Sequence, residues 1–276
     1  MASSNVSEAL KLRQKYKHFR VLVIGRANTG KTTLLKRVCN TDEDPCIYDE
    51  QGGNLLEPMD GRGLHDVNHP FAFKSNPEFI FHDSPGFEAG GEEELTRVRE
   101  FIEKCRKATE VEDQLHAIWF CFKLDKARPL HKLEMEFFTA KHSGNVPVIA
   151  IFTQFDDLIT QVMKRKLNKE MNRENALVYL MEHFQKPLEE CLVPPKAYLS
   201  LEGMHENEGD AQKQVKDLMQ KTANSLDDPS LKLLFVSIQK NNLELCIQYA
   251  VIHTEVEKFT LDRDIVYVLQ WFRHVY

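Results

Sequence analysis

The 276-residue chain lacks the features that mark several large classes of protein. Its six cysteines form no C-x-x-C pair, which is typical of reduced thiols in an intracellular protein. No apolar run approaches the roughly 18 residues that a membrane span needs, and the N-terminus has no apolar signal core. The formal net charge of −6 offers no positive surplus for a nucleic-acid backbone. We therefore expect a cytoplasmic protein with no membrane span and no nucleic-acid partner.

What the sequence does contain is a phosphate-binding motif near its beginning. An apolar stretch at 19–24 leads into GRANTGKT at 25–32, which fits the P-loop pattern G-x-x-x-x-G-K-[ST]. The two glycines allow backbone angles that a side chain would forbid. Successive N–H groups can then turn toward an anionic phosphate, aided by the positive end of the helix expected at 30–40. The motif predicts a nucleotide-binding loop.

The residues of this loop have distinct predicted roles. The catalytic group is Lys31, which would stabilise charge on the β- and γ-phosphates, and the Thr32 hydroxyl would bind Mg²⁺. Backbone N–H groups over 28–33 would surround the phosphates. The predicted nucleotide-binding residues of the loop are Gly25, Arg26, Ala27, Asn28, Thr29, Gly30, Lys31, Thr32 and Thr33.

A second motif follows the strand expected at 78–82, which ends in Asp83-Ser84-Pro85-Gly86. An acidic residue at a strand end can hold Mg²⁺ through water, so Asp83 is a predicted metal-binding residue. The backbone N–H of Gly86 could reach the γ-phosphate. We expect the segments 41–68 and 83–95 to be the parts of the chain that respond to the nucleotide.

A third motif, Thr153-Gln154-Phe155-Asp156, follows the apolar strand expected at 147–152. The carboxylate of Asp156 could accept hydrogen bonds from guanine N1–H and the 2-amino group. Adenine offers neither donor and would leave that carboxylate unpaired. Thr153 and Gln154 are predicted to bind the nucleotide beside it. The alternative is that Asp156 caps the helix expected from residue 157.

Apolar strands alternate with helices through most of the chain, which predicts an α/β fold. We expect a three-layer, mostly parallel sheet with helices on both faces, and ligands beyond the carboxyl ends of its strands. The stretch 41–65 is expected to be irregular. The predicted strands cover 19–24, 69–74, 78–82, 116–122, 147–152 and 195–200. The later helices cover 92–108, 129–142, 157–186 with one break near 169–172, and 208–224.

The phosphate motif, the Asp83 motif, the stretch 62–66 and the strand 115–122 resemble the translation-factor-related class of P-loop GTPases, and most closely the G-domain proteins of fungi. The resemblance implies a Ras-like G domain at 19–226, with an N-terminal arm at 1–18 and a helical extension at 227–276. It also implies that GTP, GDP and Mg²⁺ are ligands and that GTP is hydrolysed in a switch-like cycle. A protein effector or a second copy would bind the switch segments.

The match to that family has departures at the base motif and the first switch. Gln154 stands where the family has a lysine, so we expect guanine selectivity with reduced affinity, because the charge that tethers the P-loop is lost. No threonine occurs between Thr41 and Thr96. The switch threonine that binds Mg²⁺ in Ras-like proteins is therefore absent, replaced, or Thr41 itself.

The third departure concerns catalysis. Phe87 follows Gly86 where Ras-like enzymes have a glutamine that orients water. Asn28 matches an asparagine that in some relatives helps to bind K⁺, which could supply the missing charge. Arg26 or an arginine of a second subunit is the alternative source.

Two functions thus stay open: a GTPase whose slow hydrolysis depends on a partner or a cation, and a nucleotide-dependent interaction module without hydrolysis. An ATPase or kinase is less favoured, because no segment provides an arginine-bearing lid.

Overall fold

The structure is a computed structural model that describes residues 18–49, 54–56, 66–84, 86, 91–139, 143–206, 210–239 and 242–255. Residues 1–17 of the predicted arm at 1–18 lie outside these residues, as do residues 62–65 of the first predicted switch and Phe87 of the second.

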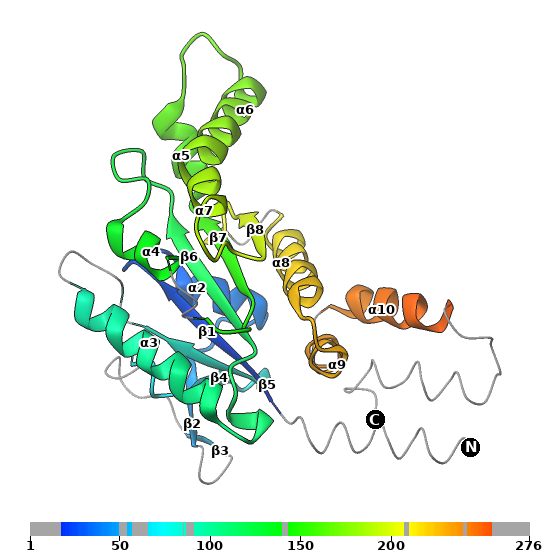
Figure 1. The fold of residues 1–276 in the computed structure, drawn as a ribbon. Coiled ribbons are helices and arrows are strands. Elements are labelled where there is room, and N and C mark those ends of the chain that lie inside the picture. Colours follow the sequence, from blue (N-terminus) through cyan, green and yellow to red (C-terminus); the bar gives the residue numbers. More distant parts are fainter. Residues whose placement is uncertain are drawn as a thin grey trace.

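The strands of the described residues form one sheet in the order β3-β2-β4-β5-β1-β6-β7-β8 (Figure 1). The five adjacent strands β5, β1, β6, β7 and β8 run parallel to one another. Strands β3, β2 and β4 are antiparallel to their neighbours. This confirms the predicted mostly parallel α/β sheet. The strands are β1 Phe19–Gly25, β2 Cys46–Asp49, β3 Asn54–Leu56, β4 Phe71–Phe73, β5 Asn76–Asp83, β6 Ala117–Lys123, β7 Val148–Thr153 and β8 Ala197–Ser200.

Strand β3 at the edge of the sheet and its neighbour β2 correct the expectation that 41–65 is irregular throughout. Tyr48 of β2 lies opposite Leu55 of β3 in an antiparallel pair. In β2 only alternate residues are buried, as on a strand with one face toward the core. Strands of three or four residues carry too short an alternation to stand out from a loop sequence.

The helices cover both faces of the sheet. One face carries α2, α8, α9 and α10, and the other carries the elements from α3 to α7. In α3, three glutamates occupy the first turn and basic residues occupy the last, which complements the helix dipole. The helices are α2 Lys31–Val38, α3 Glu92–Lys107, η1 Val111–Asp113, α4 Lys132–Phe137, α5 Phe155–Val162, α6 Lys169–Leu180, η2 Met181–Gln185, α7 Lys186–Glu189, α8 Ala211–Ser225, α9 Pro229–Ser237 and α10 Leu243–Glu255.

The helical stretch predicted at 157–186 has its break earlier than the predicted 169–172, between α5 and α6, where the sequence is rich in lysine. The side chain of Asn168 accepts a hydrogen bond from the Met171 N–H at 2.8 Å and starts α6. The buried Asn172 then accepts one from the N–H of Lys164 at 2.8 Å, which fixes the turn. The chain therefore breaks at 163–168.

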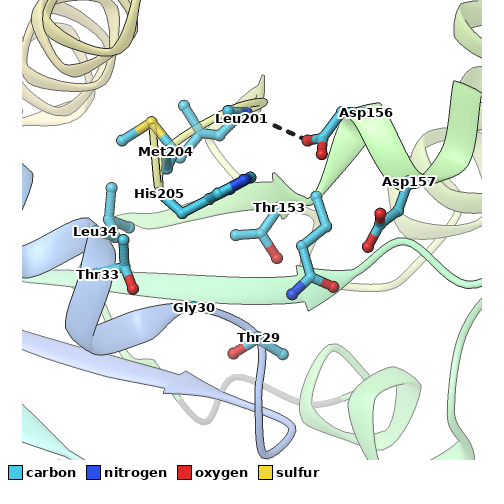
Figure 2. A pocket seen from close by; sticks show the side chains of 12 residues that line it. Thr29, Gly30, Thr33, Leu34, Thr153, Asp156, Asp157, Leu201, Met204 and His205 are labelled. Atoms are coloured by element: carbon cyan, nitrogen blue, oxygen red, sulfur yellow. Dashed lines mark hydrogen bonds between the residues drawn. The ribbon is translucent and has the colours of Figure 1, made fainter. Parts of the chain in front are cut away.

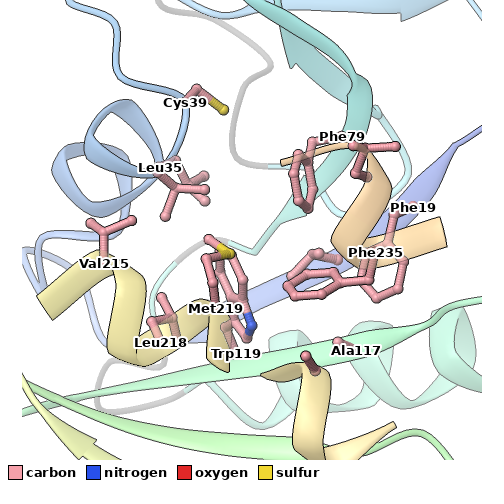
Figure 3. Close-up of a cluster of buried hydrophobic side chains, with 14 of the residues drawn as sticks. Phe19, Leu35, Cys39, Phe79, Ala117, Trp119, Val215, Leu218, Met219 and Phe235 are labelled. Atoms are coloured by element: carbon pink, nitrogen blue, oxygen red, sulfur yellow. The ribbon is translucent and has the colours of Figure 1, made fainter. Parts of the chain in front are cut away.

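The two last helices pack against the sheet. The ring of Phe235 on α9 lies 4.7 Å from the ring of Phe19 on β1 and 5.8 Å from that of Phe79 on β5 (Figure 3). Leu245 and Tyr249 of α10 are buried in the same hydrophobic cluster. Helices α9 and α10 are therefore continuous with the core. Within the described part of the chain, no helix has both the length and the apolar character to cross a membrane.

Candidate nucleotide-binding site

The predicted phosphate loop connects the central strand β1 to helix α2. Gly25 ends β1 with φ +151°, and a Cβ atom there would lie 2.1 Å from the carbonyl oxygen of Cys121 on β6. Gly30 has φ +76° and Asn28 has φ +57°, both in the left-handed region. The loop therefore turns as the glycine pattern predicts, and it opens directly into the N-terminus of α2 at Lys31.

Lys31 lies folded over this loop. Its Nζ donates hydrogen bonds to the carbonyl oxygens of Gly25 at 3.4 Å and Arg26 at 3.2 Å, and lies 3.8 Å from Oδ1 of Asp83. Asp83 arrives there because β5 runs parallel to β1, with Asp83 in register with Val23. The structure thus brings together the predicted phosphate-binding lysine and the predicted metal-binding carboxylate, and both side chains are buried.

Gly86 is in close contact with the backbone of the phosphate loop. A Cβ atom at this position would lie 1.9 Å from the backbone nitrogen of Ala27 and 2.6 Å from its Cα. Such overlap with backbone atoms excludes any side chain at residue 86 in this arrangement. The second predicted switch therefore begins in direct contact with the loop.

The side chain of Arg26 points away from the phosphate side of the loop. Its Nε donates to Oε1 of Glu134 at 2.8 Å, and its Nη2 donates to the carbonyl oxygens of Arg128 and Pro129 at 3.2 and 3.3 Å. Burial raises the pKa of Glu134 while the Arg26 charge opposes the shift. Because the guanidinium is held by this buried pair, the arrangement does not support the prediction that Arg26 supplies charge to the phosphates.

Thr41 is also distant from the phosphate loop. It follows the C-terminal end of α2, a helix of eight residues, and its Oγ1 accepts a hydrogen bond from the N–H of Glu43 at 3.1 Å. At about 1.5 Å of rise per residue, the helix separates it from Lys31 by about 12 Å. In this arrangement Thr41 is not a metal-binding residue.

A cavity of 290 Å³ opens between the phosphate loop and the base motif (Figure 2). That volume is at the lower end for a small-molecule site. Six of the predicted nucleotide-binding residues are among those around it. The cavity is lined by Thr29, Gly30, Thr33, Leu34, Thr153, Gln154, Asp156, Asp157, Leu201, Gly203, Met204 and His205.

Within the base motif, each polar side chain has a defined partner. The Thr153 hydroxyl donates to the carbonyl of Phe122 at 3.1 Å and so joins β7 to β6. The Nε2 of Gln154 donates to the carbonyl of Asn28 at 3.1 Å. The charge of the family lysine is absent, as predicted, but a neutral hydrogen bond still joins the motif to the phosphate loop.

Asp156 is held by the loop that follows β8. Its Oδ1 accepts a hydrogen bond from the backbone N–H of Gly203 at 3.2 Å, which is the dashed line in Figure 2. Helix α5 begins at Phe155 with Gln154 as its N-cap, so Asp156 lies inside the first turn. The alternative that Asp156 caps this helix is therefore wrong.

In the loop after β8, the sequence matches the family's last motif only loosely, at 200–202, and it did not predict that Gly203, Met204 and His205 line the site. The loop contributes Leu201, Gly203, Met204 and His205 to the cavity. Arg37 of α2 fixes this loop by donating to the Met204 carbonyl at 2.9 Å. Gly203 has φ +59°. A glycine three residues beyond a predicted strand end was the available signal for this turn.

Residues 20–154 match the family model described as 50S ribosome-binding GTPase. A crystal structure of a mutant NFeoB from S. thermophilus bound to GDP is similar at 16% identity and a TM-score of 0.42, covering 91% of this chain and 78% of that one. Similarity of that size does not by itself establish a shared fold. No curated protein sequence matches the chain. Residues 20–154 are therefore similar to a GTPase family, and the three motifs give this part of the chain the features of a GTP-binding G domain.

Proposed function

We propose that the protein is a guanine-nucleotide switch that hydrolyses GTP slowly, at a rate set by a partner or a cation. The observation that supports this most directly is the position of Asp156. Its carboxylate lines the cavity and is oriented by the Gly203 N–H. An acceptor-only group held in this way would pair with the N1–H and 2-amino donors of guanine.

The phosphates would lie along the other half of the site. Lys31 already bridges the loop carbonyls and Asp83, so a small movement of its Nζ would bring the ammonium to the β- and γ-phosphates. Backbone N–H groups over 28–33, at the N-terminus of α2, would surround them. Gly86, in contact with Ala27, would present its N–H to the γ-phosphate.

The residues around Asp83 fit Mg²⁺, the ion that GTPases generally use. Asp83 supplies a carboxylate and Thr32 an exposed hydroxyl in the first turn of α2, and both are the hard oxygen donors that Mg²⁺ prefers. Ser84, the next residue after Asp83, has a buried hydroxyl with no hydrogen-bond partner among the described residues. When bound, Mg²⁺ would neutralise charge on the phosphates.

K⁺ is the cation that we propose for hydrolysis. Asn28 is exposed in the left-handed turn of the loop, so its side chain is accessible to an ion there. Phe87 has no group that could orient water, so positive charge would have to come from elsewhere. Phosphate release should be faster in K⁺ than in Na⁺, and equal rates would exclude this role. No release in either salt would favour the second candidate, an interaction module without hydrolysis.

Base selectivity tests the central proposal. GTP should compete for the site far better than ATP, and Asp156→Asn should shift the preference toward xanthine nucleotides. Asp157→Asn is a matched control, because Asp157 lines the same cavity with an exposed carboxylate and should leave selectivity unchanged. Equal binding of GTP and ATP by the unaltered protein would exclude the guanine assignment.

The remaining assignments follow from the switch proposal. The segments 41–68 and 83–95 would bind a protein effector or a second copy of the chain, because they flank the phosphate loop. A cytoplasmic location is proposed from the six free cysteines, which are typical of a reducing compartment. The closer relationship to fungal G-domain proteins is likewise proposed from the motifs alone.

A further inference from the structure

The turn that follows β8 carries an aromatic side chain at the nucleotide cavity. Of the described residues that line this cavity, His205 alone has a ring. The side chain is exposed and points into the cavity, toward the side on which Thr153 and Asp156 lie (Figure 2). Among the described residues the ring has no hydrogen-bond or ion-pair partner. Because nucleobases stack on flat side chains, histidine included, this ring is available to a bound base.

The backbone on both sides of His205 is held by one side chain, that of Arg37 on α2. The Nε of Arg37 donates to the Met204 carbonyl and its Nη2 to the Glu206 carbonyl, each at 2.9 Å. The Glu206 N–H in turn donates to the Gly203 carbonyl at 3.0 Å, which closes the turn. A guanidinium presents its donors in a fixed planar geometry. Arg37 therefore fixes the position of His205 relative to α2.

The start of the same loop is fixed by two further helices. The side-chain amide of Gln214 on α8 accepts from the Glu202 N–H at 2.8 Å and donates to the Glu202 carbonyl at 2.9 Å. The carboxylate of Glu202 forms an ion pair with Arg173 of α6. An exposed histidine in a turn needs no such support if it only contacts water. A residue that binds a ligand gains from it, because less freedom is lost on binding.

We propose that His205 stacks on the purine ring of the bound nucleotide and that Arg37 is the residue that positions it. This inference rests on the function proposed above, and it divides base binding into two tasks. Asp156 reads the edge of the base through hydrogen bonds, whereas His205 covers a face of the ring. Every base has such a face, so stacking adds affinity without selecting among purines. It would offset the affinity lost with the lysine charge at Gln154.

Titrations of the full chain with GDP and with inosine diphosphate test the stacking. His205→Ala should weaken the binding of both by about tenfold and leave their ratio unchanged, whereas His205→Phe should keep the affinity. His183→Ala is the control, because His183 is also exposed but contacts Tyr179, away from the cavity. Unchanged affinity in His205→Ala would overturn the proposal. So would a changed ratio, which would mean that the ring reads the edge of the base.

Fluorescence provides a direct readout of the same contact. His205→Trp should bind GDP as the unaltered chain does, and GDP should quench the added indole, because guanine quenches the emission of an indole stacked on it. The unaltered chain, which has two tryptophans, gives the background signal. Tight binding of GDP without additional quenching would refute stacking.

The same measurements separate this proposal from the guanine assignment. Equal affinity of the unaltered chain for GDP and ADP would contradict the guanine assignment, and His205→Ala would still report on stacking. A clear preference for GDP with full affinity in His205→Ala would contradict stacking alone.

A double-mutant cycle tests the positioning role of Arg37. Arg37→Met should weaken GDP binding about threefold in the unaltered chain and much less in His205→Ala, because no ring then remains to be positioned. Arg37→Lys should recover part of the loss, since an ammonium can still donate to a carbonyl. Lys36→Met is the matched control, because Lys36 lies on the same helix but bonds to Oδ1 of Asp44 at 3.0 Å. No loss in Arg37→Met, or an equal loss with and without His205, would show that Arg37 does not act through the ring.

Discussion

The side-chain amide of Gln154 donates a hydrogen bond to the backbone carbonyl of Asn28 at 3.1 Å. This contact joins the base motif to the phosphate loop across 126 residues of sequence. In the related GTPases a charged lysine stands at the position of Gln154. A neutral amide keeps the connection but contributes less, because hydrogen bonds from charged donors are stronger than neutral ones.

Substitution of Gln154 should therefore lower or raise nucleotide affinity, depending on the residue that replaces it. Gln154→Ala removes a hydrogen bond worth about 1 kcal/mol, so GDP should bind about fivefold more weakly. Gln154→Lys should bind GDP more tightly than the unaltered protein. Fluorescent GDP titrations measure both, with Gln212→Ala as an exposed control. If Gln154→Ala retains full affinity, the hydrogen bond does not organise the site.

The sequence predicted the parts of the site that are built from short motifs at strand ends. Gly25, Asp83 and Thr153 each end an apolar strand, and parallel strands carry their ends to one edge of the sheet. The sequence could not reveal the direction of the Arg26 side chain, because its partner Glu134 is 108 residues away. Nor did it reveal Met204 as part of the cavity, because this loop has no distinctive motif.

Gly86→Ala should lower the preference for GTP over GDP. The added methyl would overlap the Ala27 backbone and move residue 86 away from the phosphate loop. If the Gly86 N–H binds the γ-phosphate, the affinity for GTP should fall about tenfold more than that for GDP, as for a hydrogen bond to a charged group. Paired titrations with GTP and GDP measure this ratio.

Gly144→Ala provides the control for that substitution. Gly144 has a positive φ of +61°, and its added Cβ would meet only the flexible side chain of Arg106, at 3.1 Å. It should lose some stability without changing the ratio of GTP to GDP affinity. An unchanged ratio in Gly86→Ala would refute contact between residue 86 and the γ-phosphate.

Stability should decrease as the pH falls below about 6.5. Burial, followed by the nearby Arg20 charge, lowers the pKa of His82 to about 3. His116 is lowered to about 4, chiefly by burial. Both folded pKa values lie below the unfolded value of about 6.5, so the unfolded chain binds more protons in that range. The two histidines are therefore stabilising as neutral groups, and this contribution is lost as the pH falls.

At pH 5 the free energy of unfolding should be lower than at neutral pH by about 2 kcal/mol for each of the two histidines. Urea unfolding between about pH 7.5 and 5 measures the loss. His82→Gln should reduce the dependence by about half, because glutamine can still donate to the Val67 carbonyl that His82 contacts at 2.8 Å. The same pH dependence in this variant would show that His82 does not stay neutral.

The buried ion pair between Arg26 and Glu134 should contribute more to stability than the half-exposed pair between Arg99 and Glu136, although both glutamates lie on α4. Glu134→Ala leaves a buried guanidinium without its carboxylate, which should cost about 3–5 kcal/mol of stability. Glu136→Ala, the control, should cost about 1 kcal/mol or less. Chemical unfolding of both variants measures the difference.

The double variant Arg26→Met with Glu134→Leu separates stability from the positioning of the loop. Because it removes both charges, it should recover much of the stability that Glu134→Ala loses. If the pair also holds the phosphate loop in place, GDP affinity should remain several-fold reduced even in this stable variant, since no apolar pair reproduces the bonds from Arg26 to the Arg128 and Pro129 carbonyls. Full recovery of GDP affinity would mean that the pair contributes to folding alone.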